Sequence, residues 1–207
     1  MQESKIRRLE PAMPVSEPWM RGSATMSQMK RKRPVTIDDM YHMPKDGRKY
    51  ELVGGEVIVT PAGMYHAEIV IKIIRIIATY LDENPIGKVY GDNVGLVFPN
   101  GNLRSPDVSF VRNEKLLPGG VSPVTFGELV PDFAVEVLSP DDRPSRVAQK
   151  IGEFLECGVP LVWVVDPQTQ TVAVYRSLSQ TQQFTAKDTI TADPVLPGFS
   201  THVSRFF

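Results

Sequence analysis

Residues 131–165 read PDFAVEVLSPDDRPSRVAQKIGEFLECGVPLVWVV, and this stretch decides the class of fold. Its two ends, residues 132–138 and 161–165, are mostly apolar runs of strand length, which is typical of strands buried in a sheet. Between them, apolar side chains recur at helical spacing and predict a helix over roughly residues 144–157. Gly158 follows as a helix stop. The stretch therefore predicts an α/β protein.

The sequence on the amino-terminal side supplies the other main helix and more strands. Residues 65–82 carry a wide apolar stripe at helical spacing, so this helix is expected to pack against a sheet. Residues 49–60 indicate a hairpin with a Gly-Gly turn. Two β-rich runs at 88–98 and 103–112 are joined by turn residues. A short helix begins at Thr36 with a capping-box pattern, and further strands are expected at 171–175 and 182–186. The fold class is thus a mixed central β-sheet flanked by two main helices.

The length of 207 residues suits one domain, or one domain with an extension. Residues 1–33 carry three prolines and no sustained periodicity, so we expect a flexible amino-terminal extension followed by a folded domain at 34–207. The extension has eight Lys/Arg and three Glu, whereas the remainder has 15 Lys/Arg and 21 Asp/Glu. An acidic body is unusual for a general nucleic-acid binder.

The cysteine and histidine content excludes several classes of site. Cys157 is the single cysteine, which rules out an internal disulfide or a multi-cysteine zinc site. The three histidines are too scattered for a zinc motif. Residues 1–33 lack the apolar core of a signal peptide. The most apolar segment, residues 69–77, is shorter than the about 20 residues that cross a bilayer. We therefore expect a cytoplasmic location and no membrane association.

Two carboxylates inside strand patterns are the first candidates for chemistry. Asp and Glu are depleted in strands and are rarely buried without a partner. Glu136 has apolar neighbours on both sides, so it needs either a basic partner or a cation. Asp107 follows Pro106 at a strand start, where a structural turn is the competing interpretation. Taken together, two strand carboxylates offer the hard oxygen ligands that Mg²⁺ or Mn²⁺ prefers.

The helix at 144–157 offers a basic group to this pair. Lys150 lies at the edge of the apolar face of the helix, whereas Gln149 points nearly opposite. Lys150 alone of the two can lean toward Glu136. A lysine that only snorkels at a helix boundary is the alternative. With a divalent cation, such a site could position a water for in-line attack on phosphorus.

Four segments together resemble one protein family. They are YELVGGEV at 50–57, RSPDVSFV at 104–111, PDFAVEVLSP at 131–140 and GVPLVWVVDP at 158–167. They occur in the order typical of the Uma-type restriction endonuclease family, within the PD-(D/E)XK nuclease superfamily. The resemblance covers roughly 34–207 and implies a restriction-endonuclease-like core.

The resemblance also implies roles for individual residues. Asp107 matches the aspartate of the PD half-motif and Glu136 the acid of the second. The second half-motif here reads Glu-Val-Leu, without a lysine two residues on, and the resemblance implies that Lys150 in the following helix replaces it. These three residues would be catalytic.

Two further positions match the family pattern. Glu51 matches a glutamate that would join Asp107 and Glu136 as a metal ligand, with an exposed hairpin residue as the alternative. His66 matches a histidine near the start of the long helix and is an accessory candidate. A hydrogen-bonded core histidine is the competing interpretation. Tyr65 departs from the family, which usually carries Glu there.

The sequence and the resemblance thus predict a Mg²⁺- or Mn²⁺-dependent endonuclease that hydrolyses nucleic-acid phosphodiester bonds, with DNA as the expected partner and the choice between DNA and RNA left open. A homodimer is a further expectation, because symmetric cutting of duplex DNA suits a twofold assembly. The alternative is a catalytically inactive nuclease-fold module that binds nucleic acid or a protein partner, which the acidic body favours. In that case Glu136 would be neutralised by Arg or Lys. A carbohydrate-active enzyme is a weaker alternative, because aromatic side chains for a sugar cleft are scarce.

Overall fold

The computed structural model describes residues 33–60, 63–116 and 126–207. The chain divides into two units, residues 1–33 and residues 34–207. The flexible extension predicted for 1–33 lies outside the described residues apart from Arg33, and it stays a prediction. All helices and strands of the described residues lie in the unit at 34–207.

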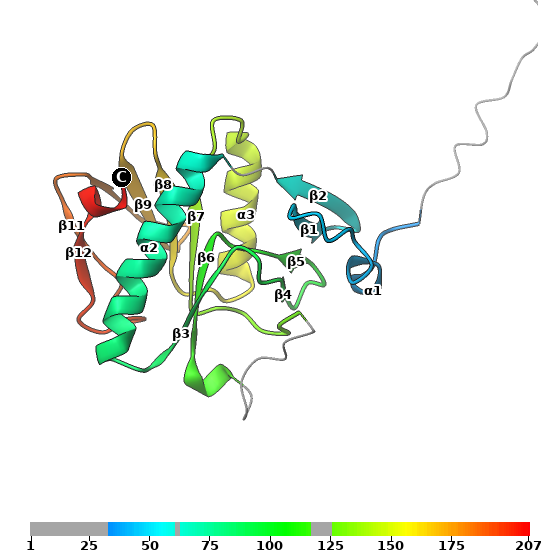
Figure 1. Cartoon of the computed structure of the whole chain (residues 1–207), viewed down its shortest axis with the longest axis horizontal. Helices are drawn as coiled ribbons and strands as arrows, with labels where there is room; N and C mark the ends of the chain where they lie inside the picture. Colours follow the sequence, from blue (N-terminus) through cyan, green and yellow to red (C-terminus); the bar gives the residue numbers. More distant parts are fainter. Residues whose placement is uncertain (1–32, 61–62, 117–125) are drawn as a thin grey trace, which may run out of the picture. The chain divides into compact units, whose positions relative to one another are not determined.

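A six-stranded sheet forms the centre of this unit, with the strand order β10-β9-β8-β7-β6-β3 (Figure 1). The middle pair, β7 and β8, is parallel, and every other pairing is antiparallel. The mixed sheet expected from the sequence is therefore confirmed. Its strands are β3 (Gly87–Gly91), β6 (Val108–Arg112), β7 (Phe133–Val137), β8 (Val162–Asp166), β9 (Thr171–Ser177) and β10 (Gln180–Thr185).

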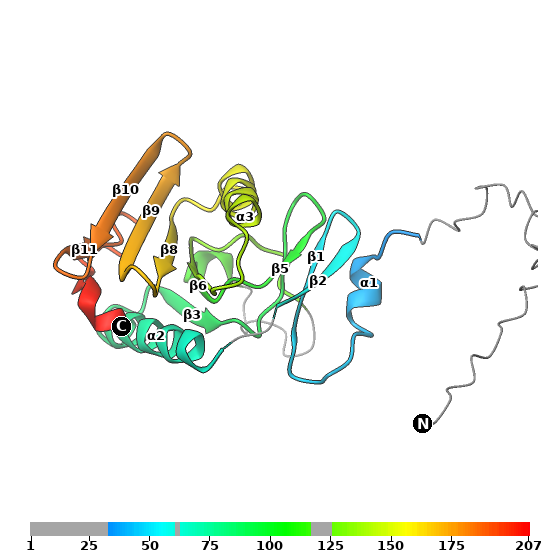
Figure 2. The same ribbon diagram turned by 90° about the horizontal axis from the view of Figure 1, so that it is seen from above.

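Two long helices cover opposite faces of the sheet, α2 (Met64–Glu83) and α3 (Pro144–Glu156) (Figure 2). Side chains alternate between the faces along a strand. Phe133, Val135 and Val137 of β7 belong to the core cluster that includes α2, whereas Ala134 packs with Phe154 of α3. By this alternation Glu136 shares the α3 face of the sheet.

A smaller, four-stranded sheet has the order β2-β1-β5-β4. Its hairpin, β1 (Lys49–Val53) and β2 (Glu56–Thr60), turns through Gly54 and Gly55. Both glycines have positive φ, which side chains with a Cβ rarely adopt. The short helix α1 (Ile37–Met40) begins with the predicted capping box and packs Met40 against this sheet. The other strands are β4 (Leu96–Val97) and β5 (Leu103–Arg104).

The two strands predicted at 88–98 and 103–112 are wrong as continuous elements. Each is broken in the middle, and its halves join different sheets: β3 pairs with β6, and β4 pairs with β5. Pro106 accounts for one break, because proline has no N–H to donate to a ladder. As a result, residues 105–107 pass from the small sheet to the large one, and Asp107 lies at that junction.

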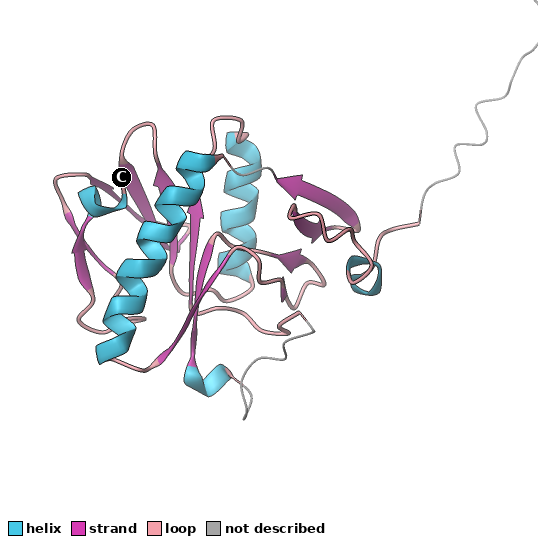
Figure 3. Cartoon of the chain, in the orientation of Figure 1, coloured by secondary structure: helices cyan, strands magenta, loops and turns pink. Residues whose placement is uncertain are grey.

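The carboxyl-terminal residues complete the α2 side of the core (Figure 3). Ile190, Phe199, Val203 and Phe206 are buried there. The sequence pattern missed the short elements of this region and the turn after β6. These are β11 (Thr189–Thr191), β12 (Ser200–His202), η1 (Asn113–Lys115) and η2 (Val203–Phe206). Within the described residues, no helix combines the length and apolar character that a membrane span requires.

Candidate active site

Charged side chains from several elements and connecting segments meet in one cavity of about 730 Å³. They include residues of β1, the start of α2, β5, the junction before β6, the end of β7 and α3. The cavity therefore gathers every site residue predicted from the sequence, together with basic residues that were not predicted, among them Lys49 and Arg104. Its charged lining includes Lys49, Glu51, His66, Arg104, Asp107, Glu136 and Lys150.

Strand register explains why Asp107 and Glu136 converge. β6 and β7 are antiparallel, with Val108 opposite Val135 and Ser109 opposite Ala134. Continuing this register by one residue places Asp107 beside Glu136. The backbone N–H of Val137 donates a hydrogen bond of 2.8 Å to Asp107 Oδ2. The two carboxylates therefore line the same cavity, as a shared metal site would require.

Asp107 is buried and surrounded by donors. Lys49 Nζ lies 2.7 Å from Oδ1, and His66 Nε2 lies 3.1 Å from Oδ2. Burial by itself raises the pKa of Asp107. The hydrogen bond from His66 and the positive charges of Lys49 and Lys150 outweigh burial and hold that pKa well below its usual range. Asp107 is thus an anion at neutral pH.

Glu136 has the opposite balance. Its Oε2 accepts a hydrogen bond of 2.8 Å from Lys150 Nζ, but its buried Oε1 has no hydrogen-bond partner in the described structure. Burial raises the pKa of Glu136 to about 7, against the attraction of Lys150, and the negative charges of Asp107 and Glu51 add to the rise. A carboxyl group with this pKa can exchange a proton near neutral pH.

Lys150 connects Glu136 to Glu51. Its Nζ lies 3.1 Å from Glu51 Oε1 as well as against Glu136. Burial alone would lower the pKa of Lys150, but the carboxylates of Glu136, Glu51 and Asp107 outweigh it and raise that pKa. Lys150 is therefore held in its charged form, and its placement at the edge of α3 agrees with the helical-wheel expectation.

Glu51 is not an exposed hairpin residue, because it is 3% exposed. The backbone N–H of Ser105 donates to its Oε1 at 2.9 Å, and Arg104 Nη1 lies 3.2 Å from its Oε2. Burial opposes its ionisation. The charges of Lys150, Lys49 and Arg104 nevertheless lower the pKa of Glu51.

Arg104 joins Glu51 to the surface of α3. Its guanidinium also pairs with Glu153, and Glu153 accepts further hydrogen bonds from the side-chain amides of Asn100 and Asn102. This buried network links the turn between β4 and β5 to α3. It fixes the small sheet against the helix that carries Lys150.

A divalent cation fits the donor set in its chemistry. Glu51, Asp107 and Glu136 present hard oxygen ligands, and Glu136 Oε1 is a buried acceptor without a donor. Within residues 33–60, 63–116 and 126–207, however, no three acidic, histidine or cysteine side chains already form a metal cage. The ammonium groups of Lys49 and Lys150 lie against the carboxylates instead.

His66 contacts Asp107, and this contact fits both the accessory role and the hydrogen-bonded core histidine expected from the sequence. Its Nε2 makes the hydrogen bond described above, whereas its buried Nδ1 has no partner in the described structure. The hydrogen bond to Asp107 raises the pKa of His66, although burial opposes the rise. The accessory position proposed for His66 therefore has a geometric basis.

Three residues of the site escaped the sequence analysis, namely Lys49, Arg104 and Glu153. Lys49 stands two residues before Glu51, and this spacing puts both on one face of a strand. Glu153 stands three residues after Lys150, on the same side of a helix. These spacings could have indicated both positions once Glu51 and Lys150 were chosen. Arg104 carried no such signal, because only the strand pairing of β1 with β5 brings it to Glu51.

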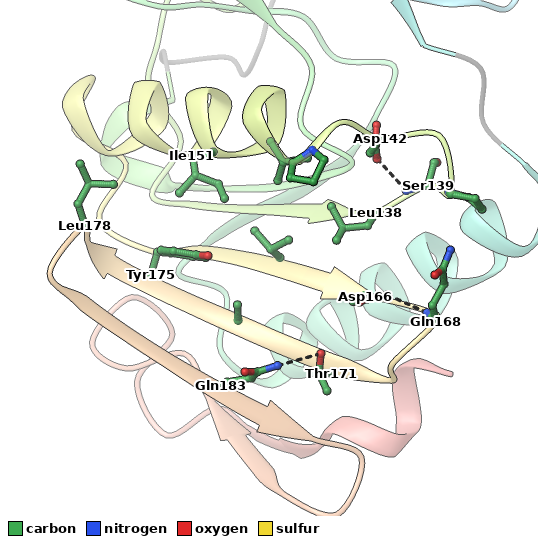
Figure 4. A pocket seen from close by; sticks show the side chains of 16 residues that line it. Leu138, Ser139, Asp142, Ile151, Asp166, Gln168, Thr171, Tyr175, Leu178 and Gln183 are labelled. Atoms are coloured by element: carbon green, nitrogen blue, oxygen red, sulfur yellow. Dashed lines mark hydrogen bonds between the residues drawn. The ribbon is translucent and has the colours of Figure 1, made fainter.

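A second cavity, of about 470 Å³, lies between α3 and strands β8 to β10 (Figure 4). It borders the first cavity through the segment after β7, since Leu138, Ser139 and Asp142 line both. Its lining contains no Lys, Arg or His. Its two carboxylates, Asp142 and Asp166, accept backbone hydrogen bonds from their own turns. It lacks the converging charges of the first cavity, which is the better candidate for catalysis.

Comparisons with known proteins identify the family and a similar fold. A family model described as "Uma2: Putative restriction endonuclease" matches residues 37–204. One similar solved structure is a putative nuclease belonging to DUF820 from Anabaena variabilis ATCC 29413. It aligns with a TM-score of 0.74 and 23% identity, over 84% of this chain and 98% of that one. At this identity the likeness shows the fold. No curated protein matches the chain.

Proposed function

Because this chain belongs to the Uma2 family, whose description is "Putative restriction endonuclease", we propose that it is a Mg²⁺- or Mn²⁺-dependent endonuclease that hydrolyses phosphodiester bonds in DNA. One observation supports this most: Glu51, Asp107, Glu136 and Lys150 meet in one cavity, and a buried oxygen of Glu136 has no donor in the described structure. Restriction-endonuclease-like families generally use divalent metal ions, and these carboxylates supply suitable ligands.

Asp107, Glu136 and Glu51 would hold the cation. A divalent cation in such a site supplies charge neutralisation at phosphorus and makes a water easier to deprotonate. Side chains of the site would carry out proton transfer and charge stabilisation. Glu136, whose Oε1 has no donor in the described structure, can accept the proton of the attacking water. Lys150, held charged by its carboxylate neighbours, can stabilise the negative charge that develops on the phosphoryl oxygens.

A polyanionic substrate needs positive charge near the cavity despite the acidic body. Arg146 lines the cavity and is exposed at the start of α3. It could contact a phosphate beside the cleaved bond. Cutting both strands of a duplex would further suit a homodimer.

The second candidate function is an inactive module that kept the nuclease fold. The close pair between Lys150 and Glu136 favours it, because a neutralised Glu136 is what such a module would show. Lys150 is also the lysine that the active enzyme needs, so the pair alone does not separate the two functions. The Oε1 of Glu136 supports the active enzyme, because this buried oxygen has no hydrogen-bond partner in the described structure and is free to bind a ligand.

The deciding experiment measures cleavage of supercoiled plasmid and single-stranded DNA in the presence of Mg²⁺ or Mn²⁺. Wild type is compared with Glu136→Ala, Lys150→Ala and the exposed control Glu83→Gln on α2. Circular dichroism checks that each variant is folded. We expect cleavage by wild type and the control, and loss in both site variants. Absence of metal-dependent cleavage by wild type would favour the inactive module.

A further inference from the structure

Lys49 is a basic residue of the site that the sequence patterns did not indicate and that has no part in the reaction proposed above. It is the first residue of β1 and its side chain is 12% exposed. Its Nζ contacts Asp107 Oδ1 at 2.7 Å, and its positive charge also favours the ionised forms of Glu51 and Glu136. It therefore acts on all three candidate metal ligands.

The two oxygens of Asp107 differ in what surrounds them. Oδ2 accepts hydrogen bonds from the backbone of Val137 and from His66, and both donors are fixed by a strand and a helix. In the described structure, the hydrogen bond at Oδ1 comes from Lys49 alone. Oδ1 is consequently the oxygen that a cation can reach, and the flexible Lys49 side chain is the part that can move.

An ammonium group and a divalent cation cannot both lie against Oδ1 without strong repulsion at contact distance. Binding of the cation therefore requires Lys49 to move away from Asp107. The displaced ammonium would remain in the cavity wall without its counter-ion, which is costly for a largely buried charge. A phosphate group is the anion that the proposed substrate would bring to the same cavity.

We propose that Lys49 competes with the divalent cation for Asp107 Oδ1 and becomes the phosphate-binding cation of the site once displaced. Metal and phosphate then bind cooperatively, because each favours the position of Lys49 that the other needs. Lys150 has a different part, since it is held between two carboxylates and keeps Glu51 when Glu136 takes a new partner. This inference rests on the proposed metal-dependent function.

A matched control lies elsewhere in the chain. Lys115 Nζ forms a similar pair with Asp132 Oδ1 at 2.9 Å, and neither residue lines the cavity. Lys115→Gln removes the same charge from the same kind of pair. It reports what the loss of a lysine–aspartate contact does outside the site.

The test is isothermal titration of Mn²⁺ into the full chain, with and without saturating thymidine 5′-monophosphate. Without nucleotide, Lys49→Gln should bind Mn²⁺ about tenfold more tightly than wild type, because the competing charge is gone. Lys115→Gln should equal wild type. The nucleotide should tighten Mn²⁺ binding about fivefold in wild type and leave Lys49→Gln unchanged.

A second measurement uses wild type alone and so does not depend on the folding of a variant. Lysines are acetylated briefly with an amine-reactive ester and quantified by mass spectrometry. Mn²⁺ should raise labelling of Lys49, and Mn²⁺ with the nucleotide should lower it again, with Lys115 constant throughout. Unchanged labelling of Lys49 would overturn the inference.

The outcomes also separate this inference from the proposed function. If wild type binds Mn²⁺ but Lys49→Gln binds it equally or more weakly, Lys49 is a structural anchor and the inference fails alone. If neither protein binds Mn²⁺, the metal-dependent function fails together with it. Tighter binding by Lys49→Gln with loss of the nucleotide effect supports both.

Discussion

In the four-stranded sheet, both carboxylate oxygens of Glu51 accept hydrogen bonds. In the six-stranded sheet, only one carboxylate oxygen of Glu136 accepts a hydrogen bond within the described structure. Glu51 of the small sheet has donors at both oxygens and a lowered pKa. Glu136 of the large sheet has one donor, an oxygen without a partner in the described structure and a pKa of about 7. Both side chains are largely buried, so burial does not explain the difference.

The number and charge of the neighbouring donors explain why the pKa of Glu51 is lowered and that of Glu136 is raised. Glu51 lies among Arg104, Lys150 and Lys49, and it also accepts a backbone N–H. Glu136 shares Lys150 with Glu51 and lies close to a second anion, Asp107. The small sheet therefore holds a carboxylate that favours its charged form, and the large sheet holds one that can exchange a proton near neutral pH. We call Glu51, Arg104 and Glu153 the closed half of the site, and Asp107, Glu136 and Lys150 the open half.

The largest expected effect contrasts Glu136→Gln with Glu51→Gln. Glu136→Gln should reduce plasmid cleavage by about 10²- to 10⁴-fold, the usual contribution of a proton-transferring residue. It should leave the urea midpoint unchanged or raised, because the buried site already favours the neutral form of Glu136. Glu51→Gln should lower the urea midpoint, because Arg104 and Lys150 lose a charged partner. If Glu136→Gln were less stable than wild type, the folded protein would not favour the neutral form of Glu136, and the contrast with Glu51 would be wrong.

The next effect tests the closed half by itself. Arg104→Met leaves Glu51 and Glu153 without their shared guanidinium, and breaking a buried ion network of this kind costs about 3–5 kcal/mol. Equilibrium unfolding in urea measures the loss. Arg48→Gln is the control, because Arg48 pairs with Asp46 at the surface and its removal should leave the midpoint unchanged.

Much of the open half could be predicted from the sequence. The β7 segment has one acid among apolar residues, and the α3 segment follows within a few residues, so local patterns indicated Glu136 and Lys150. The resemblance to the family supplied their roles and that of Asp107, and these roles stay predictions. The prediction of a mixed sheet with two helices is confirmed by the structure and by the similar fold of a solved protein described as a "putative nuclease".

The closed half could not be predicted in the same way. Its contacts join residues about 50 positions apart, such as Glu51 and Arg104, and depend on a single residue pairing of Leu52 with Leu103. No periodicity within one segment encodes that register. The same limitation explains the wrong continuous strands at 88–98 and 103–112, because their composition favours strands but does not say which sheet each half joins.

A pH titration of stability distinguishes Glu136 from Glu51 by the sign of the slope. The folded-state pKa of Glu136 is raised from 4.5 to about 7, so this residue contributes stability below pH 4.5 that is lost as the pH rises through 7. The free energy of unfolding of wild type relative to Glu136→Gln should therefore fall by up to about 3 kcal/mol between pH 4.5 and 8. Urea unfolding of both metal-free proteins across this range gives the difference.

Glu51 should give the opposite slope. Its lowered pKa contributes stability that is present above its unfolded-state value and lost as the pH falls through the folded-state pKa. Wild type relative to Glu51→Gln should thus lose its advantage on the acidic side. If both pairs of proteins gave the same slope, the two carboxylates would share one environment and the comparison would fail.

The smallest expected effect concerns α1, which packs against the small sheet that carries Glu51. Thr36 caps α1, with its hydroxyl accepting from the Asp39 backbone N–H at 3.3 Å, and α1 packs Met40 against Leu52 of the small sheet. Thr36→Ala should cost about 1 kcal/mol of unfolding free energy, as the loss of an N-cap usually does. Thr181→Ala, at an exposed position of β10, should cost less.

Cleavage at 25 °C should stay at the wild-type rate in both variants, because the contacts of Glu136 and Lys150 do not involve α1. A fall in cleavage with Thr36→Ala alone would show that the small sheet transmits its position to the reacting groups, and that the two halves act as one unit.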